Sequence, residues 1–108
     1  YPVTLTVGNN LVVTREETIA EKFMLSQNYP NPFNPVTNIQ FNIPEYSEIT
    51  LKIFNSLGQL VATPIERKQY ESGTYNVYLN LGHFSNGIYI YTLESEKWTD
   101  TKKMVILK

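Results

Sequence analysis

After residue 22 the chain is a series of short runs rich in β-branched and aromatic residues, separated by Pro, Gly and Asn. In several runs large apolar residues alternate with polar ones, which places the apolar side chains on one face of a β-strand. The clearest run is 37–43, in which Ile39, Phe41 and Ile43 share a face and Pro44 ends the alternation. Short strands at this close spacing are typical of a sheet-on-sheet sandwich.

Seven such runs lie between Phe23 and the last residue, and we expect strands at 23–29, 37–43, 48–54, 59–63, 74–80, 87–94 and 101–108. The run 87–94 is apolar on both faces, which predicts a central strand covered on each side. Pro64 cannot donate to a ladder, so it predicts that run 59–63 ends there at a sheet edge, before a polar connection over 66–72. The sequence therefore predicts an all-β, antiparallel sandwich of about seven strands.

The first 22 residues differ from the rest. Residues 1–13 predict two short strands, 3–7 and 11–13, around the turn Gly8-Asn9-Asn10. Their pattern resembles the closing strand of a polycystic-kidney-disease-type, Ig-like repeat, so we expect the remnant of a preceding β-domain or a hairpin. Residues 14–22 hold five charges and predict a solvated linker, with a short helix as the alternative. Residues 23–108 would then form the one folded domain, in a fragment of a longer protein.

Three glycines mark expected turns. Gly58 ends the four-residue loop that begins at Asn55, where a positive φ is needed. Gly73 follows Ser72, and Gly87 opens the run 87–94. We predict all three as turn glycines.

Composition argues against several functions. Nine basic and ten acidic residues give a net charge of −1, which supplies no field for nucleic acid. There is no cysteine, and His83 and Asp100 are the single residues of their types, so no zinc or calcium pattern and no catalytic arrangement is visible. No apolar run approaches the roughly 20 residues that span a bilayer. We predict a non-enzymatic chain without catalytic residues, cofactor, metal site, nucleic-acid partner or membrane span.

The most unusual segment is residues 28–35, which we call the strap. Its prolines fix φ, push the preceding residues toward extended conformations and remove three backbone donors. We expect a stiff, kinked connection that crosses from one sheet to the other, with Tyr29 and Phe33 as anchors. The strap consists of Asn28, Tyr29, Pro30, Asn31, Pro32, Phe33, Asn34 and Pro35.

The run Leu25–Pro35 resembles the opening signature of the C-terminal sorting domains carried by cargo proteins of the type IX (Por) secretion system. Further similar segments follow in chain order at 37–41 with Pro44, 51–55 with Leu57 and Gly58, 72–74, 86–89 and 102–108. Together they cover residues 23–108, whereas residues 1–22 match nothing in the pattern.

This resemblance implies an Ig-like sandwich of about seven strands, here with an N-terminal strand and linker appended, that acts as a secretion signal in Gram-negative bacteria. It implies recognition by the type IX outer-membrane translocon and passage through the periplasm to the cell surface or medium. Removal by a sortase-like peptidase is implied too, with cleavage in residues 14–22. The family also resembles the Ig-like domain of flagellar hook-capping proteins, so the fold alone does not define the function.

The last run is the second candidate signal, which we call the C-terminal strand. At a sheet edge its backbone could pair with a receptor strand, and its lysines could steer that contact. The alternative is an ordinary core strand whose lysines guard the edge against aggregation; an open edge would also allow edge-strand dimers. The strand consists of Lys102, Lys103, Met104, Val105, Ile106, Leu107 and Lys108.

A different function remains open at this point. A carbohydrate-binding or adhesive Ig-like module would need a platform of exposed aromatic rings. Tyr46, Tyr70, Tyr78 and Trp98 are the candidates, although they come from four separate segments.

Overall fold

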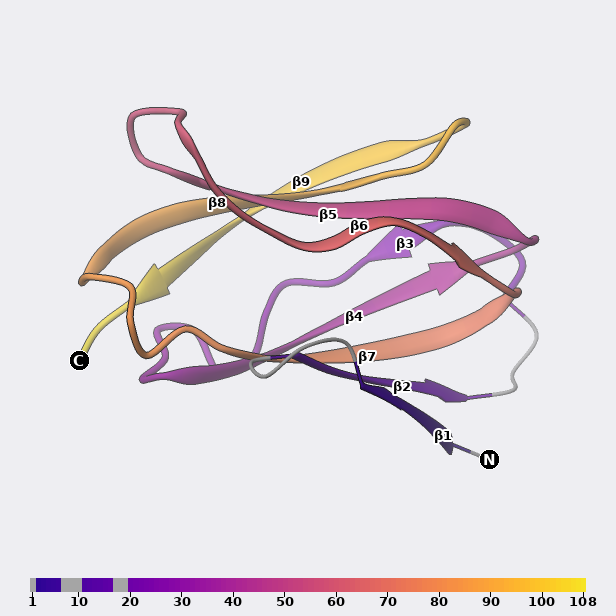
Figure 1. The fold of residues 1–108 in the computed structure, drawn as a ribbon, viewed down its shortest axis with the longest axis horizontal. Coiled ribbons are helices and arrows are strands. Elements are labelled where there is room, and N and C mark those ends of the chain that lie inside the picture. Colours follow the sequence, from indigo (N-terminus) through magenta and orange to yellow (C-terminus); the bar gives the residue numbers. More distant parts are fainter. Residues whose placement is uncertain (1, 7–10, 17–19) are drawn as a thin grey trace.

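The computed structural model describes residues 2–6, 11–16 and 20–108, with the side chains of 2–6 left aside. Over these residues it contains nine β-strands and no helix. The strands form two antiparallel sheets that face each other as a sandwich (Figure 1). Within the described ranges there is thus no helix with the length and apolar character to cross a membrane.

One sheet has the strand order β1-β2-β7-β4-β3 and the other has the order β6-β5-β8-β9. The strands of the first sheet are β1 (Pro2–Thr6), β2 (Leu11–Glu16), β7 (Gly73–Asn80), β4 (Val36–Ile43) and β3 (Met24–Leu25). Those of the second are β6 (Leu60–Tyr70), β5 (Ser47–Asn55), β8 (Gly87–Glu94) and β9 (Thr99–Ile106).

All seven runs predicted after residue 22 contain a strand, β3 to β9, so the predicted all-β sandwich is confirmed. The alternation explains why, since each strand contributes its apolar face to one shared core. Ile39, Phe41 and Ile43 of β4 have no exposed surface, and neither do Ile49, Leu51 and Ile53 of β5 in the opposite sheet. The core thus lies between the two layers.

Strand β8 is central in its sheet, between β5 and β9, as predicted. The expectation that both of its faces are covered is wrong. Tyr91 and Leu93 are fully buried on the inner face, whereas Ile88 on the other face is 46% exposed. Because this sandwich has only two layers, the outer face of its central strand remains in contact with solvent.

Strand β6 lies at a sheet edge, as Pro64 predicted, but it does not end there. It continues to Tyr70, so the expected polar connection over 66–72 is largely strand. The pairing of β6 with β5 contains register shifts, and Arg67 has a φ of 51°. These irregularities accommodate a proline inside an edge strand, where a missing outward donor leaves no partner unpaired.

The N-terminal strands add to the β7 side of the first sheet. β2 pairs with β7 from Leu11↔Leu79 to Glu16↔Thr74, so it extends three residues into the segment expected to be a linker. The turn expected at Gly8-Asn9-Asn10 and residues 17–19 of the expected linker lie outside the described residues. The assignment of residues 1–13 to a preceding domain stays a prediction.

Candidate recognition surface

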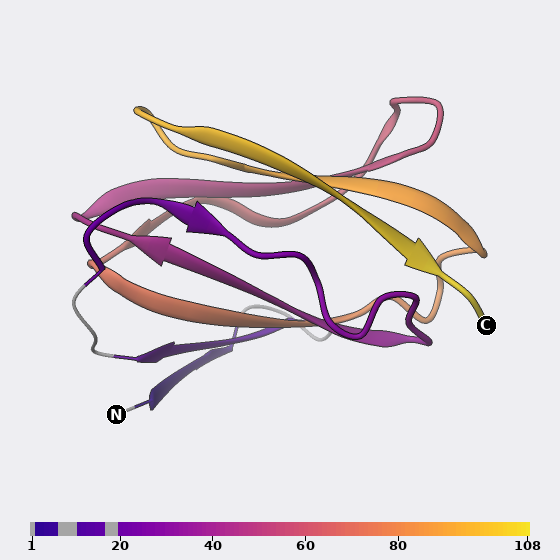
Figure 2. The ribbon, with the colours of Figure 1, turned by 180° about the vertical axis from the view of Figure 1, so that it is seen from behind.

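The strap connects β3 to β4, which are neighbours in the same sheet, and touches the other sheet on its way (Figure 2). The predicted crossing from one sheet to the other is therefore wrong as a path, although the strap does contact both layers. Tyr29 and Asn38 exchange two backbone hydrogen bonds of 2.9 Å, which hold the strap against β4. Phe33 forms a parallel bridge with Ile106 of β9.

The bridge at Phe33 consists of two backbone hydrogen bonds to β9 and the residue after it. The Phe33 N–H donates to the Val105 carbonyl oxygen at 3.0 Å, and the Leu107 N–H donates to the Phe33 carbonyl oxygen at 3.0 Å. The strap thus occupies the outer edge of β9 where an additional strand would pair.

Two side chains extend this contact along β9. The Val105 N–H donates to Asn31 Oδ1 at 2.9 Å, across 74 positions of the chain. Gln27 Nε2 donates to the Lys103 carbonyl oxygen at 2.6 Å, across 76 positions. The two segments singled out in the sequence, the strap and the C-terminal strand, therefore form one continuous surface. Gln27 was not among the predicted site residues, although it lies inside the run that carries the family resemblance.

Buried polar groups fix the strap from inside. Asn28 is only 2% exposed, and its Nδ2 donates to the Pro30 carbonyl oxygen at 3.1 Å and to Thr37 Oγ1 at 3.0 Å. Thr37 Oγ1 donates in turn to the same Pro30 oxygen at 2.8 Å. These bonds satisfy polar atoms that would otherwise be buried without partners, and they fold the strap back on β4.

Tyr91 holds the segment just before the strap from the opposite sheet. Its hydroxyl donates to the Ser26 carbonyl oxygen at 2.7 Å, and its ring is fully buried. Burial raises the pKa of the Tyr91 phenol far above its ordinary value. The hydroxyl therefore remains protonated at all physiological pH values and continues to donate.

The two aromatic residues of the strap have different environments. Phe33 is 2% exposed and packs in the core, so its role as an anchor is confirmed. Tyr29 is 79% exposed, so its predicted role as an anchor is wrong. Its backbone pairs with Asn38, which lies opposite the exposed Tyr78 in the register, so this position belongs to the outer face of the sheet. The exposed part of the strap comprises Tyr29, Pro30, Asn31, Pro32 and Asn34.

The C-terminal strand combines core and surface positions. Met104 and Ile106 are buried, as the interpretation of a core strand required, while Lys103 is exposed and Leu107 is 61% exposed. β9 is the last strand of its sheet, which confirms the expected edge position. However, Gln27 and the strap already bond to the outward backbone groups from residue 103 to 107. A receptor strand could reach that backbone only by displacing the strap.

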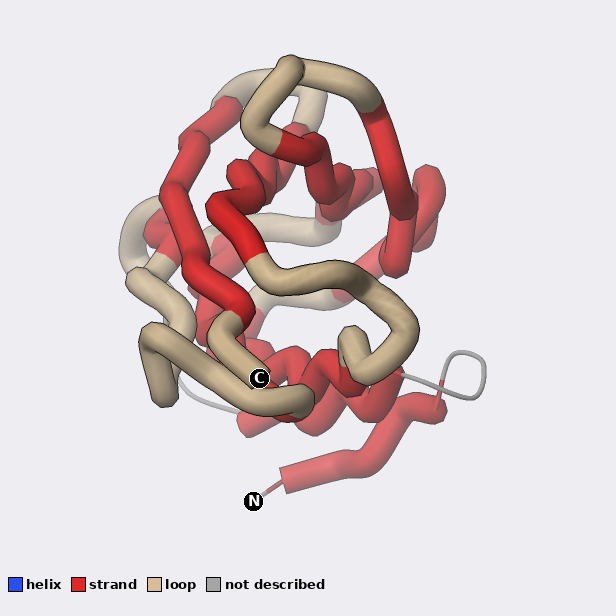
Figure 3. Tube along the Cα trace, turned by 90° about the vertical axis from the view of Figure 1, so that its left-hand side faces the viewer, coloured by secondary structure: helices blue, strands red, loops and turns tan. Residues whose placement is uncertain are grey.

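The last residue is tied to the loop between β7 and β8. Lys108 Nζ donates to the Gly82 carbonyl oxygen at 2.6 Å, and its N–H donates to Asn86 Oδ1 at 2.9 Å. The Leu81 N–H in the same loop donates to the Pro35 carbonyl oxygen at 2.9 Å. Figure 3 looks at this end of the sandwich, where loops and the chain terminus gather. The strap and the C-terminal strand form what we call the composite surface, and these bonds extend it to the β7–β8 loop.

The three predicted turn glycines do not lie together. Gly58 has a φ of 82°, the positive value expected for its hairpin loop, and its N–H donates to the Asn55 carbonyl oxygen at 3.0 Å. Gly87 pairs with Ile106 beside the composite surface, whereas Gly73 begins β7 at the opposite end. Of the three, Gly58 lies in a turn, whereas Gly73 and Gly87 are the first residues of β7 and β8.

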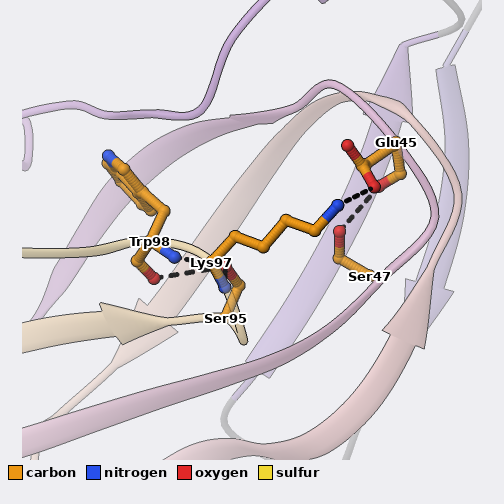
Figure 4. A network of polar contacts seen from close by, with 5 residues as sticks. All are labelled: Glu45, Ser47, Ser95, Lys97 and Trp98. Carbon is orange, nitrogen blue, oxygen red and sulfur yellow. Dashed lines mark hydrogen bonds and ion pairs between the residues drawn. The ribbon is translucent and has the colours of Figure 1, made fainter.

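The opposite end of the sandwich contains a separate polar network (Figure 4). Lys97 Nζ lies 2.9 Å from Glu45 Oε2, which links the β8–β9 hairpin to the β4–β5 loop. The hydrogen bond that Lys97 donates to the Glu45 carboxylate raises the pKa of Lys97. Both side chains are exposed, so this ion pair adds little to stability.

The four aromatic residues of the alternative function, a carbohydrate-binding module, do not form one exposed platform. Tyr70 is 6% exposed and packs edge-on against Tyr75, with ring centroids 4.9 Å apart. Trp98 stacks on Phe23 at 5.3 Å, where it closes the β8–β9 hairpin. Burial of Tyr70 in the core removes one member of the proposed set, and the exposed Tyr46 and Tyr78 lie on different elements.

The fold and these contacts define a small β-sandwich domain in which the strap and the C-terminal strand form one surface. A family model described as "Secretion system C-terminal sorting domain" matches residues 27–107. The chain belongs to this family, the C-terminal sorting domains of the type IX secretion system. A comparison with curated proteins finds no match to the chain.

Membership in the family confirms the resemblance seen in the sequence. Its members are sorting signals and not catalytic domains, and the family implies interaction with the type IX secretion machinery. It also implies a secreted protein that is exported through the outer membrane. The match begins at residue 27 and so leaves out β1, β2 and β3.

Proposed function

We propose that the composite surface of the strap and the C-terminal strand is the part of this sorting signal that the type IX outer-membrane translocon recognises. One observation carries this proposal: four hydrogen bonds join the strap region to the C-terminal strand. The two segments with the most distinctive sequences thus act as one surface. On this account, the translocon takes the parent protein from the periplasm and delivers it to the cell surface or the medium.

The exposed chemistry of the surface suggests what its receptor offers. Tyr29 and Leu107 are 79% and 61% exposed, so both present apolar surface beside the contacts between the strap and the C-terminal strand. Lys103 and Lys108 add positive charge at the same surface. An apolar receptor groove with an acidic rim would complement this arrangement.

The rigidity of the strap favours binding. Its prolines restrict the backbone, and buried Asn28 and Phe33 hold it in place. A surface that is ordered before binding loses little conformational entropy on binding, so more of the contact energy remains as affinity.

We further propose that a sortase-like peptidase removes the domain by cutting within residues 14–22. Thr14–Glu16 belong to β2, and a strand must leave its sheet before it can enter a protease cleft. Glu21 and Lys22 are exposed and outside any strand, so they are the more accessible described part of this segment.

Export of a reporter tests the recognition surface. A periplasmic reporter is fused ahead of the full chain in a bacterium with a type IX system, and its distribution between periplasm and medium is measured. The double substitution Tyr29→Ala with Leu107→Ala should leave most of the reporter in the periplasm. Tyr46→Ala is the matched control, because Tyr46 is 65% exposed in the β4–β5 loop at the other end of the sandwich.

Thermal unfolding of the purified variants must accompany this experiment. Substitutions at exposed positions are expected to change stability by within about 0.5 kcal/mol each, so a loss of export cannot be ascribed to unfolding. Undiminished export of the double variant, or equal loss with Tyr46→Ala, would contradict recognition through this surface.

Charge reversal tests the contribution of the lysines. Lys103→Glu with Lys108→Glu should reduce export while the fold persists, because both side chains are exposed. Deletion of residues 103–108 is less informative, since it also removes buried Met104 and Ile106 from the core. Normal export of the charge-reversed chain would show that the lysines play no part in recognition.

A further inference from the structure

Strand β2 completes a sheet of the sorting domain from outside the region that defines the family. The family match covers residues 27–107, and β2 spans Leu11–Glu16. In the sheet order β1-β2-β7-β4-β3, β7 would be an edge strand without β2 (Figure 1). An edge strand with unpaired backbone groups is a template for another strand.

The contact between β2 and β7 has the character of a core contact. Their antiparallel register runs over six residue pairs without an irregularity. Leu11 is 4% exposed and Val13 has no exposed surface, and they lie opposite Leu79 and Val77, which are also buried. The alternate side chains of β2 therefore belong to the same core as those of β7.

The end of β2 is held by a specific clamp. Arg15 Nε and Nη2 donate to the Ser72 carbonyl oxygen at 3.3 Å and 2.8 Å, and Nη2 lies 3.7 Å from Glu71 Oε2. Gly73 leaves room for this approach, because a Cβ there would lie 3.0 Å from the Glu16 carbonyl oxygen. The turn before β7 thus fits a strand with an arginine at this position.

From these contacts we propose that the edge of β7 is a strand-accepting site, filled here by the chain's own β2. It accepts an antiparallel strand of the pattern Leu-x-Val-x-Arg, in which Leu11 and Val13 enter the core and Arg15 binds the Ser72 carbonyl. The same segment from a second copy of this chain is the partner that fits the site when β2 is displaced. Main-chain pairing supplies affinity and the alternate pockets supply specificity, as in strand addition elsewhere. This inference goes beyond the sorting signal and does not depend on the proposed translocon contact.

A gain of binding tests the proposal in the full chain. Val13→Asp places a carboxylate in the core, which should displace β2 and open the edge of β7. A fluorescein-labelled peptide of residues 1–16 is then titrated, and binding is followed by anisotropy. We expect one peptide per chain and a Kd at least about tenfold lower than for the unsubstituted chain, whose site is occupied.

Val12→Asp is the matched control, because Val12 is the neighbouring residue of the same strand and is 38% exposed. Its chain should keep β2 in place and bind no more peptide than the unsubstituted chain. A labelled peptide that itself carries Val13→Asp should bind none of the three chains. Equal binding to all chains, or no binding to a folded Val13→Asp chain, would overturn the proposal.

A second measurement decides the matter if circular dichroism shows that the Val13→Asp chain is unfolded. A protease recognition sequence is inserted between Lys22 and Phe23 of the unsubstituted chain, which is then cut after folding. By native mass spectrometry the N-terminal fragment should remain bound and should be replaced by excess labelled peptide. Immediate loss of the fragment without uptake of the peptide would refute a strand-accepting site.

Discussion

Phe33→Ala should destabilise the domain far more than any substitution in the exposed part of the strap. Phe33 is 2% exposed, and truncation of a buried Phe to Ala costs about 3–5 kcal/mol. We take the lower value, about 3 kcal/mol, as the expected minimum, because the stiff strap cannot close over the cavity that the substitution leaves. This is a large part of the total free energy of unfolding, which is roughly 5–15 kcal/mol for a protein domain. At 4 °C or more per kcal/mol, the melting temperature should fall by about 12 °C or more.

The assay is urea and thermal unfolding followed by circular dichroism, with Tyr29→Ala as the matched control. Tyr29 belongs to the same motif but is 79% exposed, so its removal should cost no more than about 0.5 kcal/mol. The urea midpoint should decrease for Phe33→Ala without a change of slope, which indicates lost stability and not a different unfolded state. Similar losses for the two variants, or a loss under about 1 kcal/mol for Phe33→Ala, would refute the assignment of Phe33 as the anchor.

Two further predictions concern other parts of the fold. Burial, with Tyr75 nearby, raises the pKa of Tyr70 to about 12 from 10.0, so between these values the unfolded chain releases a proton that the folded chain keeps. The contribution of Tyr70 to stability should be constant below pH 10 and should fall as the pH rises above it. Tyr70→Phe should therefore make the loss of stability between about pH 9 and pH 11, measured as urea midpoints, shallower, and an unchanged slope would contradict this. Gly58→Ala forces an alanine into a φ of 82°, which should lower the free energy of unfolding by about 1–2 kcal/mol. The cost comes from the backbone alone, because a Cβ at this position meets no atom within 4 Å. An unchanged melting temperature would show that the loop relaxes freely.

The positions of the strands could be predicted from local sequence because alternation is itself a local property. The inward residues of β4 and β5 follow from period two alone. The end of β6 could not be predicted in this way, since Pro64 is tolerated at an edge through irregular pairing with β5. Likewise, the short run at 11–16 gives no sign of its partner β7, which lies about 60 residues further along the chain.

The candidate surface shows the same division between local and long-range information. The prolines of the strap predicted a stiff segment, but the different burial of Tyr29 and Phe33 depends on pairing with Asn38 and Ile106. The contacts of Gln27 and Asn31 with β9 connect positions more than 70 residues apart. The local pattern of neither segment carries information about this pairing. The sequence could therefore indicate the strap and the C-terminal strand separately, but not that they form one surface.

The joining of the strap and the C-terminal strand into one surface affects how a sorting signal of this kind would operate. Each half of the surface is a short peptide, and in an unfolded chain the halves are separated by a long, flexible loop whose closure has an entropic cost. The halves meet only when β9 has joined its sheet and Phe33 has entered the core. A translocon that contacts both halves would therefore bind the folded domain in preference to the unfolded chain. On the proposed recognition mode, destabilisation by Phe33→Ala should reduce export in proportion to the unfolded fraction, whereas Tyr29→Ala should reduce it with the fold intact.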